Sequence, residues 1–287
     1  MKELFLILFV TLTFFSCSEN EGEVPKEENV LIWSDEFDYS GLPDENKWGY
    51  EYGFIRNKED QFYMKNRLEN AEVRNGNLVI TSKKERFKNP WYKEGSPKWQ
   101  YNREYVEYTS ASIITRGKFS LKYGRVEVRA KLPEGEGTWP AIWMLGNNIS
   151  DIGWPRCGEI DVMEYLGRQS NLIYGTCHYG DKDGKHKSEG KHITVNPEPS
   201  KDFHVYAVNW YPDRIEFYYD DLKYFTFKTD QANTGTDNAF HKPFYLLMNF
   251  ALGGWGGEID DTVLPQEYLI DYVRIYQLED MIRDSKE

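Results

Sequence analysis

The sequence predicts an all-β sandwich, and three observations support this. The chain is rich in residues that favour strands and turns, with 21 Tyr, 16 Phe, 9 Trp and 23 Gly among its 287 residues. From Val30 onward, short runs of β-branched and aromatic residues alternate with Gly, Asn, Asp and Pro. No stretch of a dozen residues has an amphipathic helical period. Since helices do not alternate with the strands, we expect antiparallel sheets forming a sandwich, jelly roll or barrel.

The expected strands follow one another at short intervals. In 125–131, Val126 and Val128 alternate with Glu127 and Arg129, which is the period of a strand with one buried face. The tripeptide at 211–213, Tyr-Pro-Asp, predicts a turn between two further strands. The other expected strands are 78–81, 111–115, 119–121, 173–178, 204–211, 214–220, 224–228, 244–250 and 268–276. Between them, the aromatic loop 86–108 is long enough to predict a functional loop.

The N-terminus resembles an export signal. Lys2 precedes an apolar run, 4–15, of about 12 residues, which is shorter than the roughly 20 that span a bilayer. The sequence FFSC at 14–17 resembles a bacterial lipobox, in which Cys17 would be lipidated. Because Phe14 stands where leucine is usual, ordinary secretion is the alternative. We expect an exported protein, lipid-anchored at the outer membrane or cell surface of a bacterium.

The remaining organisation follows from composition. Residues 1–16 are the expected lipoprotein signal peptide, 17–29 an acidic tether, 30–277 one domain and 278–287 a charged tail. The formal net charge is −12, and no basic run is long or free of acids, which argues against a nucleic-acid partner. A neutral ligand such as a sugar polymer fits better. We expect a monomer that contacts a membrane only through its lipid.

The stretch GEIDVMEYLG at 158–167 places three acids, Glu159, Asp161 and Glu164, among apolar residues. A regular strand would put Glu159 and Asp161 on one face and Glu164 on the other. One extra residue, inserted as a β-bulge near Val162 or Met163, would bring all three acids onto one face. The alternative is an edge strand whose acids point into solvent.

Two cysteines, Cys157 and Cys177, flank this strand. If 158–164 and 171–178 form a hairpin, the two could lie across from each other, and an exported protein permits a disulfide. The alternative is that both are buried as free apolar residues.

The same stretch resembles the E-x-D-x-x-E active-site signature of glycoside hydrolase family 16. Blocks on both sides resemble its bacterial laminarinases in the same order, and the resemblance covers about 30–277. They are WSDEFD (33–38), RNKEDQFY (56–63), GTWPAIWMLG (137–146), IGWPRC (152–157), GTCHYG (175–180), MNFALGGWGG (248–257) and DYVRIYQ (271–277).

The resemblance implies a jelly roll of two curved antiparallel sheets with a concave substrate cleft. It also implies a retaining endo-glycosidase that hydrolyses β-1,3-glucan without a catalytic cofactor. Mixed-linkage β-1,3-1,4-glucan and galactan are alternative substrates. A glycan-binding surface lipoprotein without turnover is the alternative from another class.

The resemblance assigns roles to the three acids. Glu159 is the implied nucleophile and Glu164 the implied general acid/base, with Asp161 between them sharing the proton balance. A retaining mechanism needs its two carboxyls about 5 to 5.5 Å apart, which one bulged strand can provide. Crowded carboxylates raise one another's pKa, so the three are expected to titrate as a set.

The implied substrate-binding residues are polar or aromatic: Asn57, Glu59, Trp139, Trp143, Trp154, His178, Asn249 and Trp255. Trp139 and Trp143 share a strand face, since their offset is four, and aromatic rings suit the C–H faces of sugars. His178 is expected to bond Glu164 or substrate. The alternative for the histidine and these tryptophans is a place in the core. The loop that carries Trp255 is shorter than the laminarinase pattern, which leaves its position open.

The resemblance also implies a structural calcium ion. Its ligands would be the carboxylates of Glu36 and Asp271 and the carbonyl of Gly76, since calcium prefers oxygen. The alternative is that these are ordinary surface acids.

Overall fold

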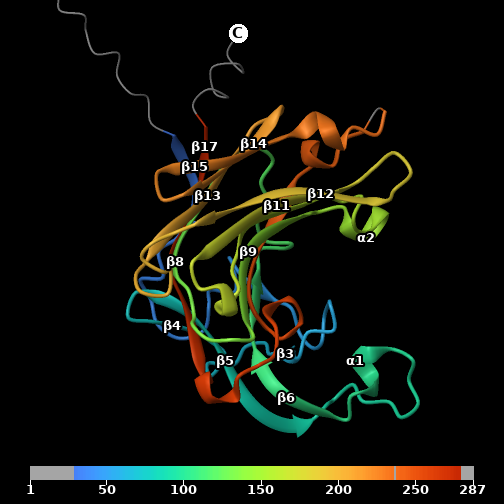
Figure 1. The fold of residues 1–287 in the computed structure, drawn as a ribbon, viewed down its shortest axis with the longest axis vertical. Coiled ribbons are helices and arrows are strands. Elements are labelled where there is room, and N and C mark those ends of the chain that lie inside the picture. The colour runs from blue at the N-terminus through green and yellow to red at the C-terminus, as the bar shows by residue number, and fades with distance from the viewer. Residues whose placement is uncertain (1–28, 236, 279–287) are drawn as a thin grey trace, which may run out of the picture.

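The computed structural model describes residues 29–235 and 237–278, which form two curved sheets packed face to face (Figure 1). The predicted signal peptide, the lipidation site Cys17, most of the tether and most of the tail lie outside the described residues. Within the described part of the chain, no helix is both long and apolar enough to cross a membrane. The predicted all-β jelly-roll architecture is confirmed.

The larger sheet has ten strands in the order β15-β14-β13-β8-β17-β5-β6-β3, with β1 paired to β17 and β4 to β5. Their bounds are β1 Val30–Asp35, β3 Gln61–Tyr63, β4 Ala71–Arg74, β5 Asn77–Lys88, β6 Tyr105–Ser110, β8 Gly124–Lys131, β13 His204–Trp210, β14 Arg214–Tyr219, β15 Leu222–Lys228 and β17 Gln266–Gln277. Its neighbours are antiparallel except β3 and β6, which are parallel.

The smaller sheet has seven strands in the order β12-β11-β10-β9-β16-β7-β2, and it carries the acidic stretch in its middle. Their bounds are β2 Gly49–Tyr50, β7 Ser112–Ile114, β9 Thr138–Gly146, β10 Glu159–Glu164, β11 Leu172–Gly180, β12 His186–Thr194 and β16 Phe244–Leu252. All of its pairs are antiparallel. Since β10 is flanked by β9 and β11, the edge-strand alternative is wrong.

Helical segments are short, as the absence of a helical period predicts. The α-helices are α1 Trp99–Asn102 and α2 Ile149–Ile152, and the 3-10 turns are η1 Gly167–Gln169, η2 Thr229–Ala232, η3 Ala239–His241, η4 Gly254–Gly256 and η5 Asp261–Val263. The expected strand at 119–121 is wrong: only Leu121 forms a bridge, to Phe244. The loop expected at 86–108 is shorter than predicted, because β5 and β6 extend into it from both ends and leave residues 89–104.

The main core lies between the sheets and is built by the alternation seen in the sequence. In β8, Val126, Val128 and Ala130 are fully buried, while the residues between them are half-buried. In β10, Ile160 and Val162 point into the same core. The other face of the smaller sheet is therefore the concave face.

The two cysteines lie on opposite faces of the smaller sheet. Cys177 pairs with Ile160 and packs in the main core, whereas Cys157 packs with Trp143 and Leu145 on the concave side. Both are free and buried, so the disulfide alternative is wrong.

Candidate active site

The predicted β-bulge is present in β10. Along β9, Asp161 pairs with Trp143 and Met163 with Ile142, so Val162 is the extra residue. The register to β11 also shifts between Asp161 and Glu164. Val162 and Met163 both enter the main core. The bulge consequently returns Glu164 to the face that carries Glu159 and Asp161, and all three line one cleft.

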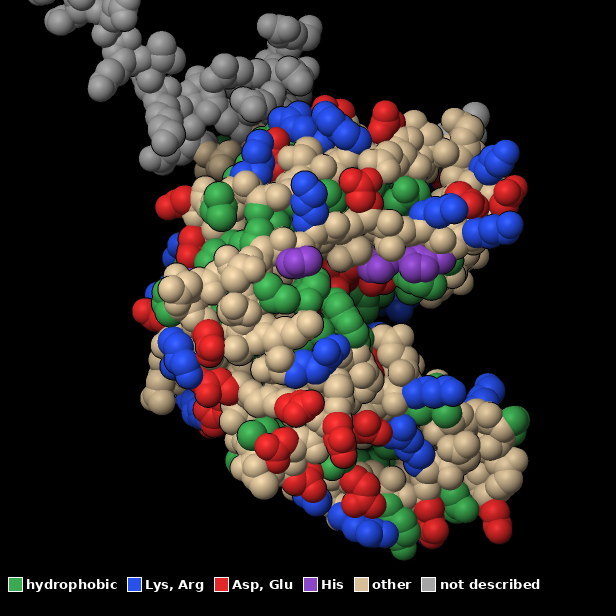
Figure 2. All heavy atoms as spheres, in the orientation of Figure 1, with side chains coloured by type: hydrophobic (Ala, Val, Ile, Leu, Met, Phe, Trp, Pro, Cys, Tyr) green, Lys and Arg blue, Asp and Glu red, His purple; other side chains and the backbone are tan. Residues whose placement is uncertain are grey.

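This cleft has a volume of about 350 Å³ and opens on one side of the molecule, where Figure 2 shows the hollow. Six of the eight predicted substrate residues line it beside the three acids: Asn57, Glu59, Trp139, Trp143, Trp154 and Asn249. The core alternative is wrong for Trp154, which is 47% exposed, whereas Trp143 lines the cleft and also packs in a buried apolar cluster with Leu145 and Cys157. Arg56 and Ile149 also line the cleft, and the sequence did not single them out.

Burial raises the pKa of all three acids. The pKa of Glu159 rises to about 8, through burial and then through the charge of Asp161. Burial raises the pKa of Asp161 to about 7. Burial, followed by the charges of Asp161 and Glu159, holds the pKa of Glu164 well above its usual range. Glu164 is thus held toward its protonated form by burial and by the two neighbouring acids.

Each glutamate accepts a hydrogen bond from a different tryptophan. Trp154 Nε1 donates to Glu159 Oε2 at 2.9 Å, and Trp139 Nε1 donates to Glu164 Oε1 at 3.2 Å. Trp154 is 47% exposed, so its ring also faces solvent. Because a donor favours the ionised carboxylate, both tryptophans oppose the effect of burial on the pKa of their partners.

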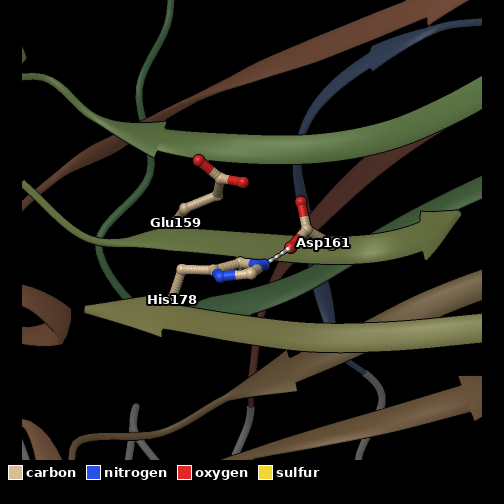
Figure 3. A group of neighbouring side chains, drawn as sticks. All are labelled: Glu159, Asp161 and His178. Carbon is tan, nitrogen blue, oxygen red and sulfur yellow. Dashed lines mark ion pairs between the residues drawn. The ribbon is translucent and has the colours of Figure 1, made fainter. Parts of the chain in front are cut away.

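His178 lies beside Asp161 and not Glu164, so of its two expected partners only the substrate stays a prediction. Its Nε2 is 3.1 Å from Asp161 Oδ2, as Figure 3 shows. The strand register explains this contact. Glu159 pairs with His178 and Asp161 with Thr176 on β11, so His178 and Asp161 are diagonal neighbours on the same face of the sheet. The other ring nitrogen, Nδ1, lies 2.8 Å from Nε2 of His186 on β12. His186 was not predicted; no local pattern reveals a partner on the next strand.

A hydrogen-bonded chain that includes Trp143 and Asn249 forms another part of the cleft wall. Trp143 Nε1 donates to Asn249 Oδ1 at 2.6 Å, and Asn249 Nδ2 donates to Tyr63 OH at 2.9 Å. Glu59 accepts from Gln61 Nε2 at 2.7 Å, and burial raises its pKa. These bonds fix the orientation of Trp143, whose ring is almost fully buried.

Arg56 supplies the positive charge of this wall. Its guanidinium lies 4.7 Å from the centroid of the Trp143 ring and pairs with Glu51. Burial lowers the pKa of Arg56, but the charges of Glu51, Tyr63 and Glu59 together with the hydrogen bond to Glu51 outweigh burial and raise that pKa overall. Arg56 therefore remains charged beside three acids that repel one another.

Trp255, whose position the sequence left open, stands next to the cleft. Its ring meets Trp139 edge-on at 5.6 Å between centroids and Tyr174 at 5.1 Å. Arg168 Nη2 donates to its backbone carbonyl at 2.9 Å. The ring is 40% exposed and extends the aromatic wall beyond Trp139.

The implied calcium ligands are engaged with arginines. Glu36 accepts two bonds from Arg274, at 3.1 and 2.8 Å, and Asp271 Oδ2 lies 2.6 Å from Arg129 Nη1. An ion held by both carboxylates would have to break both arginine pairs. The residues as arranged do not form a calcium site, so calcium stays a prediction of the resemblance.

A model of glycosyl hydrolases family 16 matches residues 58–274. The chain belongs to this family. It is 42% identical to a beta-glucanase of Rhodothermus marinus over 274 residues, covering 91% of this chain and 88% of that protein. The laminarinase structure from the same organism is 41% identical with a TM-score of 0.74, covering 87% of this chain and 98% of that one.

A second similar structure comes from work on endo-acting O-glycanases of the human gut microbiota that initiate mucin breakdown. It is 36% identical with a TM-score of 0.83, and the match covers 90% of this chain and 94% of that one. The chain is therefore a glycoside hydrolase.

Proposed function

We propose that the protein is a retaining endo-β-1,3-glucanase that works by double displacement. The observation that carries the proposal is the bulge at Val162, which places Glu159 and Glu164 on one face of β10 inside an open cleft. Retaining hydrolysis needs one carboxylate to attack and one carboxylic acid to protonate the leaving oxygen. A single strand that presents both groups supplies this pair.

The surroundings of the two glutamates support the roles of nucleophile and general acid/base that the resemblance implies. Glu164 has the strongly raised pKa and holds the proton that the leaving glycosidic oxygen needs. Glu159 attacks the anomeric carbon, and the donor Trp154 Nε1 stabilises its ionised form. Asp161 on β10 takes part in the shared proton balance, and Nε2 of His178 on β11 lies 3.1 Å from its Oδ2. Glu164, once deprotonated, then activates water to release the sugar.

The neutral sugar backbone suits the cleft, because its wall combines indole rings with a few polar groups. The similar beta-glucanase and laminarinase support β-1,3-glucan as substrate. A second candidate is a linkage in O-glycans, which the similarity to the structure from the O-glycanase work supports.

The test compares purified wild type with Glu159→Gln and Glu164→Gln on laminarin, cereal β-glucan, lichenan, agarose and mucin O-glycans. We expect release of reducing sugar from laminarin and its loss by at least about a hundredfold in both variants. Glu189→Gln, which removes an acid from the neighbouring β12, is the matched control. Full activity of either catalytic variant, or first products with inverted anomers in NMR, would refute the mechanism.

The N-terminal sequence supports export with lipid attachment at Cys17, and we propose that the enzyme acts as a monomer at the bacterial surface. Growth with labelled palmitate should label the wild type and leave Cys17→Ser unlabelled. Labelling of both proteins, or of neither, would contradict the lipid anchor.

A further inference from the structure

A second hollow lies beside the cleft, under the connection between β5 and β6. This connection, residues 89–104, folds around α1 on the side of the molecule where the cleft opens (Figures 1 and 2). The hollow has a volume of about 610 Å³, within the size range of small-ligand sites. Its aromatic and cationic lining comprises Phe54, Lys58, Trp91, Lys98, Trp99 and Tyr101.

The hollow and the catalytic cleft share a wall. Residues Asn57 and Glu59 line the cleft, whereas Lys58 lines the hollow. Arg103, from the β5–β6 connection, donates to the backbone carbonyls of Lys58 and Glu59 at 3.2 and 3.3 Å and pairs with Asp60 at 3.1 Å. The connection is thus fastened to the wall, and a chain leaving the cleft can reach the hollow.

The aromatic rings of the hollow are held in place by packing. Trp99 lies 5.8 Å from Phe54, and Trp91 lies 5.6 Å from Phe62, between ring centroids. The Trp91 ring covers Gly53, where a Cβ atom would come within 2.0 Å of it. Gly53 also has a φ of +105°, so no side chain suits this position. Rigid rings of this kind offer stacking surfaces to sugars.

The charge of the connection is opposite to that of the chain. Residues 89–104 carry three basic residues and two acids, a net charge of +1 in a chain of −12. These are Lys93, Lys98 and Arg103 against Glu94 and Glu104.

The lysines around the hollow are not neutralised by acids. Within residues 29–235 and 237–278, no carboxylate lies within 4.0 Å of the ammonium groups of Lys58, Lys93 or Lys98. Lys93 and Lys98 instead lie 5.4 and 5.9 Å from the centroid of the Tyr101 ring. Exposed ammonium groups beside fixed rings are the donors that an anionic sugar requires.

We propose that this hollow is a subsite for an anionic sugar unit, sulfated or carboxylated, on the glycan whose backbone occupies the cleft. This inference rests on the proposed glycosidase function and adds a substrate class to it. The anionic unit is disfavoured at the catalytic centre, because Glu159 must be ionised there to attack and would repel it. Lys58 at the shared wall and Lys98 on the connection bind the anionic unit away from the catalytic acids, and the rings of Trp91 and Trp99 pack against its apolar face.

The test measures binding in the full-length Glu159→Gln protein, so that hydrolysis does not consume the probe. Calorimetry at low salt compares laminarin, sulfated laminarin and carboxymethylated laminarin. We expect both anionic forms to bind more tightly than laminarin, and Lys58→Gln/Lys98→Gln to weaken their binding about three- to tenfold. Laminarin binding should not change. Lys122→Gln/Lys228→Gln removes the same charge from exposed lysines elsewhere and is the control.

The outcomes separate the subsite from the proposed function. Anionic binding that is indifferent to the Lys58/Lys98 substitution, or no tighter than laminarin binding, would overturn the subsite. A larger effect on the sulfated than on the carboxymethylated form identifies sulfate as the preferred group, and the reverse identifies carboxylate. If the wild type fails to cleave laminarin while the lysine dependence holds, the glucanase assignment fails and the subsite stands.

Discussion

The two tryptophan donors allow the roles of the two glutamates to be separated by pH. Trp154→Phe keeps an aromatic ring but removes the hydrogen bond to Glu159, and Trp139→Phe removes the one to Glu164. A hydrogen bond to a charged group contributes about 1.5 to 3 kcal/mol, and the exposure of Trp154 reduces this to about 1 kcal/mol. One pKa unit corresponds to about 1.36 kcal/mol, so the expected change is about 0.7 unit.

The sign follows from the protonation state that each glutamate needs. Loss of a donor destabilises the carboxylate and raises its pKa. Glu159 must be ionised to attack, so in Trp154→Phe the acidic limb of kcat/KM should move to higher pH. Glu164 must be protonated, so in Trp139→Phe the basic limb should move to higher pH and activity should persist further into alkali.

The assay is kcat/KM on soluble laminarin from pH 4 to pH 10 for both variants. Trp255→Phe is the matched control, since this exposed indole lies beside the cleft and contacts neither glutamate through Nε1 in the described residues. Neither limb should move in it. A shift of the basic limb alone in Trp154→Phe, or of the acidic limb alone in Trp139→Phe, would reverse the assigned roles.

Three further outcomes follow from the bulge, the buried acids and the thiols. Deleting Val162 should turn Glu164 toward the core and lower kcat at least about a hundredfold, whereas Val162→Ala should keep activity. Reducing-sugar assays measure both variants, and equal activity of the two would contradict the role of the bulge. Because the folded-state pKa of Glu164 is raised, its ionisation opposes folding as the pH rises above its unfolded value. Glu164→Gln should therefore melt above wild type at pH 8 but not at pH 4 in calorimetry, and the opposite order would refute this. Burial and then the charge of Glu159 raise the pKa of Cys157 to about 11, and Cys177 is fully buried. Thiol reagents should therefore label neither cysteine before unfolding, and a reductant should leave the melting temperature of the protein unchanged.

Local periodicity determined much of this protein from the sequence alone. The alternation in β8 predicts its buried residues, because side chains of a strand alternate faces whatever the neighbouring strands are. The spacing of Glu159, Asp161 and Glu164 likewise predicts the bulge. In a regular strand Glu164 would face the opposite side from Glu159 and Asp161, so only an extra residue brings all three onto one face. The ordered blocks around it identified the family.

The tertiary structure decided which partners these residues meet. His178 faces Asp161 and His186 rather than Glu164, because strand register sets contacts between neighbouring strands. Asn249 meets Tyr63 across 186 residues of sequence, and Glu36 meets Arg274 across 238, which no local pattern encodes. The assignment of one tryptophan to each glutamate and the basic hollow beside the cleft arise in the same way. These contacts depend on the positions of loops in space, and the packing of the two sheets determines those positions.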